Sequence, residues 1–152
     1  MKNSHFTRQE RHIILWLRFL TFSFLVVGLV FAFQPNYFLQ YLDSVGLVFF
    51  NFQSHSLGHP QFEIWWILTL SAMGAMTYAA FQAQSDWLRY HLLVPVIIVS
   101  KAIAAFGFLA VIVFYPTHFF YIVAFVVDAL LCLTTIYAYA QAIQSRSYSR
   151  LQ

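Results

Sequence analysis

The sequence predicts an all-α integral membrane protein: a four-transmembrane-helix antiparallel bundle with a short amphipathic helix in its first outer loop. Composition is the first reason, because 61% of the 152 residues are hydrophobic and only 9% are charged. A soluble domain carries roughly a quarter charged residues. The second reason is that four apolar runs are each long enough to cross a bilayer. The aromatic fraction of 20% excludes a disordered chain, and the single cysteine excludes a disulfide framework.

The four runs form one membrane domain over residues 1–152. They cover residues 13–33, 62–83, 92–114 and 119–142, and each contains a single charged residue. About 20 residues at 1.5 Å per residue cross a hydrocarbon core of about 30 Å. Because no water reaches the backbone there, each run should be a helix.

The first run should be an uncleaved anchor, since its apolar core exceeds that of a signal peptide and no small-residue cleavage site follows. Leu and Phe occur on all its sides, so we expect it at the periphery of the bundle. The second and third runs carry small residues that allow close helix contact, so we expect these two to pack together at the centre. Those residues are Ser71, Ala75 and Ala79 in the second run and Ser100, Ala104, Ala105 and Gly107 in the third.

The outer loop covers residues 34–61 and begins with Pro35, which should end the first helix. Residues 36–45 have the apolar spacing of a short amphipathic helix, and Gly46 should close it. Residues 47–52 are too apolar to remain in water. They re-enter the membrane, pack on the bundle or meet another subunit.

The basic residues predict the orientation. Seven of them flank the runs on one side, and the loops 34–61 and 115–118 on the other side have none. The seven are Lys2, Arg8, Arg11, Arg18, Arg89, Arg146 and Arg150. The positive-inside rule then places both termini in the cytoplasm, in a bacterial inner (plasma) membrane. The net charge of +3 therefore reflects topology, and no nucleic-acid partner is expected. Trp16 and Trp87 should mark the cytoplasmic boundary as part of an aromatic belt.

Lys101 and Asp128 are the only charged residues near the middle of a run. Lys101 lies 15 residues before Pro116 and Asp128 lies 12 residues after it, so their depths differ by about 4–5 Å in antiparallel helices. A lone charge at the bilayer centre costs about 2.5–3.5 kcal/mol, so the two should face each other. One reading is an ion pair that fixes the register of the helices. The other is an ion relay or an anchor for a polar ligand.

Three residues continue the face of Asp128 toward the cytoplasm: Cys132, Thr135 and Tyr139. This polar stripe either lines a wet cavity or makes interhelical hydrogen bonds. At the other boundary, His55, His59 and Glu63 with His118 are weak metal candidates. Gly58 and Pro60 interrupt the helix that their spacing would need, so no metal site is predicted.

Two basic residues at the cytoplasmic boundary, Arg18 and Arg89, are candidates for binding lipid head groups. His91 and His12 are the nearest approach to a pair of haem ligands. These two residues do not suit haem ligation, because no run contains a second histidine at the same depth as His91. No cofactor is therefore assigned.

No phosphate-binding loop, HExxH, nucleophile elbow or CxxC motif occurs in the chain, so an enzyme is not favoured. We expect a non-catalytic subunit, assembly factor or scaffold whose partners are the bilayer and other membrane subunits or further copies of the chain. The alternative is a small transporter or lipophilic-ligand-binding protein that uses Lys101 and Asp128. In outline, the four spans resemble small bacterial proteins of the DoxX-like kind. No motif carries that likeness, and nothing is transferred from it.

Overall fold

The computed structural model describes residues 7–33, 35–52, 62–115 and 118–149, with the side chains of all of these except 35–36, 62–66 and 147–149. Every element in these ranges is an α-helix, and no strand occurs in them. In chain order the helices are α1 (Arg8–Phe33), α2 (Pro35–Phe50), α3 (Phe62–Ser85), α4 (Trp87–Tyr90), α5 (Leu93–Phe114) and α6 (Phe119–Ser149).

Three of the helices are long and apolar enough to cross a membrane: α1, α5 and the segment Phe119–Arg146 of α6. The all-helical membrane class predicted from composition is therefore supported. Residues 37–50 of α2 form a shorter apolar helix. Helix α3 has 24 residues and is not one of the three when only its described residues are counted. The described residues thus give three candidate spans, against the four that the sequence predicts.

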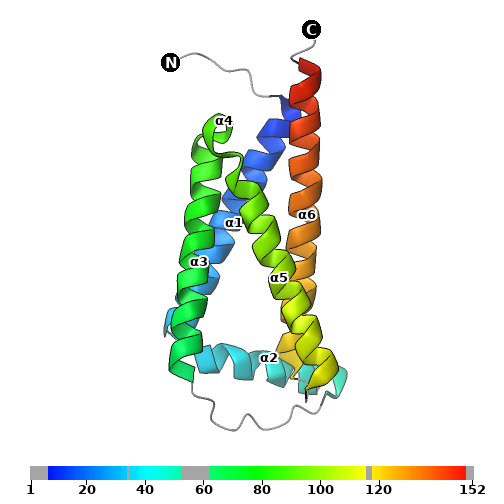
Figure 1. Cartoon of the computed structure of the whole chain (residues 1–152). Helices are drawn as coiled ribbons and strands as arrows, with labels where there is room; N and C mark the ends of the chain where they lie inside the picture. The colour runs from blue at the N-terminus through cyan, green and yellow to red at the C-terminus, as the bar shows by residue number, and fades with distance from the viewer. Residues whose placement is uncertain (1–6, 34, 53–61, 116–117, 150–152) are drawn as a thin grey trace.

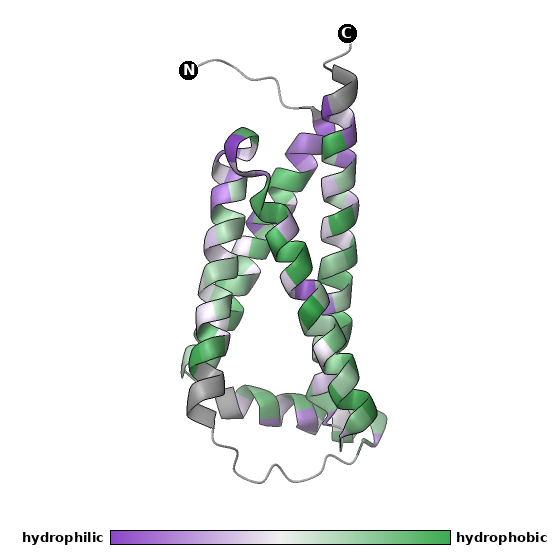
Figure 2. Cartoon of the chain, in the orientation of Figure 1, coloured by the Kyte–Doolittle hydropathy of each residue, from purple (hydrophilic) through white to green (hydrophobic). Residues whose placement is uncertain are grey.

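The long helices form two antiparallel pairs, α1 with α3 and α5 with α6. Figure 1 shows the pairs close together at the end that carries α4 and farther apart toward the other end, where α2 lies across the bundle. We call these the α4 end and the α2 end. Hydrophilic residues gather at the α4 end, and a further hydrophilic band lies midway along α5 and α6 (Figure 2).

Helix α1 begins five residues before the predicted apolar run because a capping box starts it. The Thr7 backbone N–H donates to Glu10 Oε2 at 2.8 Å, and the Glu10 N–H donates to Thr7 Oγ1 at 3.2 Å. Each side chain satisfies a backbone donor that the first helical turn leaves free. Thr7 Oγ1 also lies 3.0 Å from Ser145 Oγ, which joins the start of α1 to the end of α6.

Helix α2 is longer than predicted. As expected, α1 ends before Pro35; the proline then becomes the first residue of α2, a position that tolerates its missing N–H. The expectation that Gly46 closes the helix is wrong, because α2 continues to Phe50. Gly46 serves packing instead: a Cβ there would lie 2.6 Å from the Phe119 Cβ, so only glycine lets α2 approach α6 this closely. The apolar residues after Gly46 thus extend α2.

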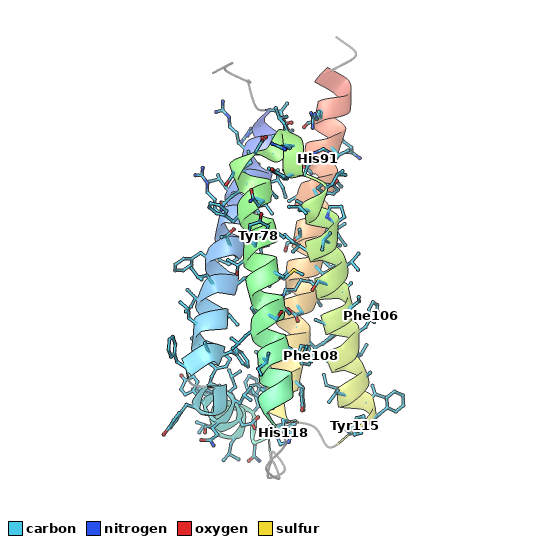
Figure 3. All side chains as sticks on the ribbon, turned by 60° about the vertical axis from the view of Figure 1, so that its left-hand side comes forward. Tyr78, His91, Phe106, Phe108, Tyr115 and His118 are labelled. Carbon is cyan, nitrogen blue, oxygen red and sulfur yellow. The ribbon has the colours of Figure 1, made fainter. Side chains whose placement is uncertain are left out.

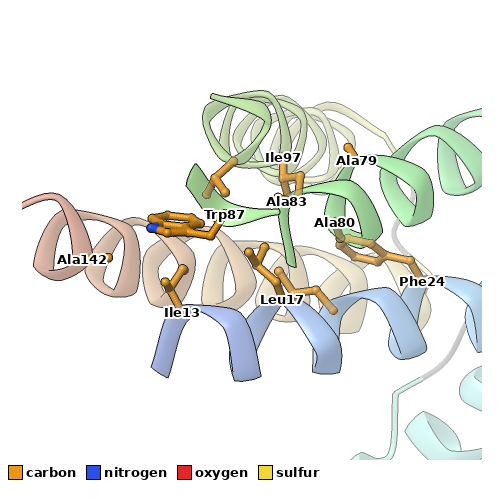
Figure 4. Packing of buried hydrophobic residues seen from close by; sticks show 11 residues of the cluster. Ile13, Leu17, Phe24, Ala79, Ala80, Ala83, Trp87, Ile97 and Ala142 are labelled. Atoms are coloured by element: carbon orange, nitrogen blue, oxygen red, sulfur yellow. The ribbon is translucent and has the colours of Figure 1, made fainter. Parts of the chain in front are cut away.

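The buried core lies in the half of the bundle nearer α4, and α1 contributes most to it. Ile13, Leu17, Leu20 and Phe24 follow one face of α1 and are all fully or almost fully buried (Figure 4). The prediction that the first helix is peripheral is therefore wrong. Helix α1 carries bulky apolar side chains on several faces. One of these faces lies in the core, and the others, including Phe22, remain exposed.

The predicted close contact of the second and third helices is also wrong for most of its length. Helix α3 packs chiefly on α1, and α5 packs chiefly on α6. Ala79 is buried, but Ser71 and Ala75 of the same small-residue row are exposed, as is Gly107 on α5. Small residues permit a close approach but do not specify which helix makes it.

Candidate functional site

Lys101 of α5 and Asp128 of α6 form an ion pair in the middle of the molecule. The Lys101 Nζ donates to Asp128 Oδ1 at 2.7 Å, so the two side chains meet as the register about Pro116 predicts. Only 9% of the lysine side chain and 12% of the aspartate side chain are exposed. A short, charge-assisted hydrogen bond between two covered groups is a strong interaction.

A ring from α1 covers the lysine. Lys101 Nζ lies 4.9 Å from the centroid of the Phe24 ring, which adds a cation–π contact to the ion pair. Three helices, α1, α5 and α6, therefore meet at this point. Phe24 is the last buried residue of α1 toward the α2 end, and on α5 the buried residue Ala105 follows Lys101 by one turn.

The three residues that follow Asp128 on its face of α6 make contacts between helices. The Cys132 thiol donates to the Ile98 carbonyl oxygen of α5 at 3.6 Å. Thr135 is 1% exposed, and its hydroxyl accepts a hydrogen bond from Trp16 Nε1 of α1 at 2.9 Å. The Tyr139 ring packs edge-on against the Trp87 ring, with centroids 6.1 Å apart. The stripe thus joins α6 to α1, α4 and α5.

The two tryptophans expected at the cytoplasmic boundary lie inside the bundle. Trp16 is half-buried and hydrogen-bonded to Thr135, and Trp87 is 1% exposed. Trp87 belongs to the core because Asp86 caps the short helix α4 through the Arg89 N–H and turns the chain inward. Trp87 is therefore a core residue and not a ring of the belt, whereas for the half-buried Trp16 the belt stays a prediction.

A second polar group, which the sequence reasoning did not identify as such, lies at the α2 end. Asp43 of α2 places Oδ2 3.4 Å from His118 Nδ1, and its Oδ1 accepts from the Phe120 N–H at 3.4 Å. His118 precedes α6, so Asp43 binds both a histidine and the positive end of the helix. The signal in the sequence was Asp43 itself, the one acidic residue of α2.

The metal candidates do not form a site in the part of the chain that is described. No group of three or more His, Cys, Asp or Glu side chains comes together there. His118 lies against Asp43, whereas His55 and His59 lie outside the described residues and the Glu63 side chain is also outside the description. His91 and His118 lie at opposite ends of the bundle (Figure 3).

The boundary arginines lie at the α4 end. Arg18 is exposed on α1, and the Arg89 guanidinium lies 5.2 Å from the centroid of the Tyr90 ring. His12 is exposed, while the His91 ring lies 5.9 Å from the Trp87 ring, so the two histidines considered for haem lie in different surroundings.

Comparison of the chain with protein-family models, with curated proteins and with solved structures finds no match.

Proposed function

We propose that the chain is a four-span membrane protein that acts as a non-catalytic subunit, assembly factor or scaffold in a membrane complex. The observation that carries this proposal is the state of Lys101 and Asp128. They bind each other at 2.7 Å under the ring of Phe24, so their hydrogen-bonding and charge are directed inward. A group that anchors a polar ligand would need to offer an unsatisfied charge to it.

The proposal of four spans rests on the pairing of α3 with α1. The two helices have 24 and 26 residues, about 36 and 39 Å at 1.5 Å per residue, and they lie antiparallel along each other. If α1 crosses a bilayer, its partner of equal length crosses it too.

The orientation follows from the charges at the two ends. Arg8, Arg11, Arg18, Arg89 and Arg146 belong to the α4 end, whereas residues 35–52 contain no lysine or arginine. The positive-inside rule then assigns the α4 end to the cytoplasm and α2 to the outer surface of a bacterial inner membrane.

A partner helix is the occupant that best suits the exposed face of α3. Lipid tails favour bulky apolar side chains, whereas Ser71 and Ala75 are small, and Tyr78 accepts a hydrogen bond from Gln82 Nε2 at 2.8 Å. Small and polar residues on one face are typical of contacts between transmembrane helices.

Site-specific photocrosslinking in native membranes tests this function. A photoreactive residue at Ala75 should give one discrete protein adduct, and the same residue at Ile103, exposed on α5, should give only lipid adducts. Equal protein adducts from both positions, or none from either, would contradict an assembly role. The alternative of a transporter or ligand-binding protein that uses Lys101 would be favoured if Lys101→Met removed a bound small molecule from the folded protein.

A further inference from the structure

Helix α2 lies at the level where two candidate membrane spans end. Its Phe38 ring lies 5.6 Å from the ring of Phe31, in the last turn of α1. Its Asp43 Oδ1 accepts from the N–H of Phe120, in the first turn of α6. Helices α1 and α6 are both candidate spans, and α2 runs across the bundle between these two ends (Figure 1). In a bilayer, α2 would therefore lie along the boundary at which α1 and α6 leave the membrane.

The exposed surface of α2 carries no charged side chain. Asp43 is the one charged residue of the helix, and it is directed toward His118 and the start of α6. A helix face in bulk water normally carries charged residues. Tyrosine and apolar side chains instead suit the boundary between lipid head groups and hydrocarbon. The exposed residues of α2 are Tyr37, Gln40, Tyr41, Ser44, Leu47, Val48, Phe49 and Phe50.

The last turn of α2 is the least covered part of the helix. Leu39 and Gly46 are buried against the bundle, and Phe50 continues their row by one further turn. The Phe50 ring stacks on the ring of Phe119, with centroids 5.2 Å apart, and the residue is still 68% exposed. Phe49 beside it is 74% exposed. The side of α2 that faces the membrane is therefore covered by protein in its first turns and only partly covered in its last.

The exposed apolar surface of the bundle continues to the same level on another helix. Val113 and Phe114, in the last turn of α5, are 65% and 77% exposed at the α2 end. Helix α5 is also a candidate span, so lipid is the medium that its exposed apolar side chains would meet. Equally apolar side chains of α2 at this level would meet the same lipid.

We propose that α2 is an interfacial helix whose last turn inserts into the leaflet at the α2 end. A lipid surface is then the partner of Phe49 and Phe50. The opposite face, which carries Tyr37, Tyr41 and Ser44, lies among the head groups and water. The inference goes beyond the proposed function and does not rest on it, since it needs only that the bundle lies in a bilayer.

Electron paramagnetic resonance of a nitroxide label on single cysteines tests the proposal. The full-length protein, with Cys132→Ala as background, is reconstituted in vesicles of phosphatidylcholine and phosphatidylglycerol. Oxygen concentrates in the hydrocarbon, whereas a nickel chelate stays in water. Insertion about 5–10 Å deep should make the ratio of oxygen to nickel collisions at least about threefold higher for Phe49→Cys than for Ser44→Cys. Ser44 is the matched control because it is exposed on the opposite side of the same helix, and Ile103→Cys on α5 gives the ratio for hydrocarbon.

Two results would overturn the proposal. Equal ratios at the two positions would show that α2 is not inserted along one side. Few collisions with either reagent at Phe49→Cys would show that a second copy or another part of the chain covers the last turn. Leu47→Cys, exposed in the same turn, repeats the measurement if the label at Phe49→Cys displaces the helix, and it should also give a higher ratio than Ser44→Cys. The photocrosslinking at Ala75 is independent, so failure of the assembly role leaves this outcome readable.

Discussion

Each of the two charges in the middle of the bundle is unfavourable without the other. An isolated charge at the centre of a bilayer costs about 2.5–3.5 kcal/mol on insertion scales. The contact between Lys101 Nζ and Asp128 Oδ1 offsets part of this cost. At the scale of single residues, we propose that the pair sets the register of α5 against α6.

Replacing one residue of the ion pair should destabilise the protein much more than replacing both. Asp128→Asn leaves a buried lysine without its counter-charge and should lower the free energy of unfolding by about 3–5 kcal/mol. The double variant Lys101→Met/Asp128→Leu should recover most of that loss. Denaturation in mixed micelles, followed by tryptophan fluorescence, measures both. A single variant as stable as wild type would show that the pair is not structural.

Thr135 and Thr134 form a matched pair for the hydrogen bond between α6 and α1. Thr135→Val removes the acceptor of Trp16 Nε1 and should cost about 0.5–1.5 kcal/mol, in the range of interhelical polar contacts in membranes. Thr134 is exposed and bonds only within its own helix, so Thr134→Val should change little. The same denaturation assay compares them, and equal effects would argue against the Trp16 contact.

At the scale of elements, α2 is the helix whose end was predicted wrongly from the sequence. A contact in the folded structure gives the reason. Gly46 was expected to end α2 because glycine often follows the last turn of a helix, and this expectation uses only neighbouring residues in the chain. The decisive partner, Phe119, lies 73 residues away in the chain and cannot be seen from local patterns. The ends of α3 and α5 were predicted to within two residues, whereas α1 begins five residues before its predicted run and α6 ends seven residues after it. Apolar runs mark only the part of a helix that would lie in the bilayer, so polar extensions of the helix are missed.

The position of α2 should depend on the missing side chain at Gly46. Gly46→Ala overlaps Phe119 and should cost about 1–3 kcal/mol as α2 is displaced from α6. Gly107→Ala is the control, because no atom lies within 4 Å of its added Cβ; it should stabilise by up to about 1 kcal/mol through the better helix propensity of alanine. Thermal unfolding of the two purified variants gives the comparison, and a neutral Gly46→Ala would refute the packing role.

At the scale of the whole molecule, the same sequence features predicted the class and the paired charges but not the helix neighbours. Depth along the membrane follows from residue counts, so Lys101 could be matched with Asp128 through Pro116. Which helices become neighbours in the bundle depends on which of their faces make contact. Leu17 is buried and Phe22 is exposed on the same apolar helix, and nothing in their hydrophobicity separates them.

The central claim is that α3 crosses the membrane and leaves the α4 end in the cytoplasm. Single cysteines in a Cys132→Ala background, treated in intact cells with a membrane-impermeant thiol reagent, test it most directly. Gln40→Cys on α2 and Tyr115→Cys after α5 should be labelled, whereas Leu88→Cys on α4 and Gln141→Cys on α6 should be labelled only after lysis; all four positions are exposed. Labelling of Leu88→Cys in intact cells, together with Gln40→Cys, would contradict the four-span bundle.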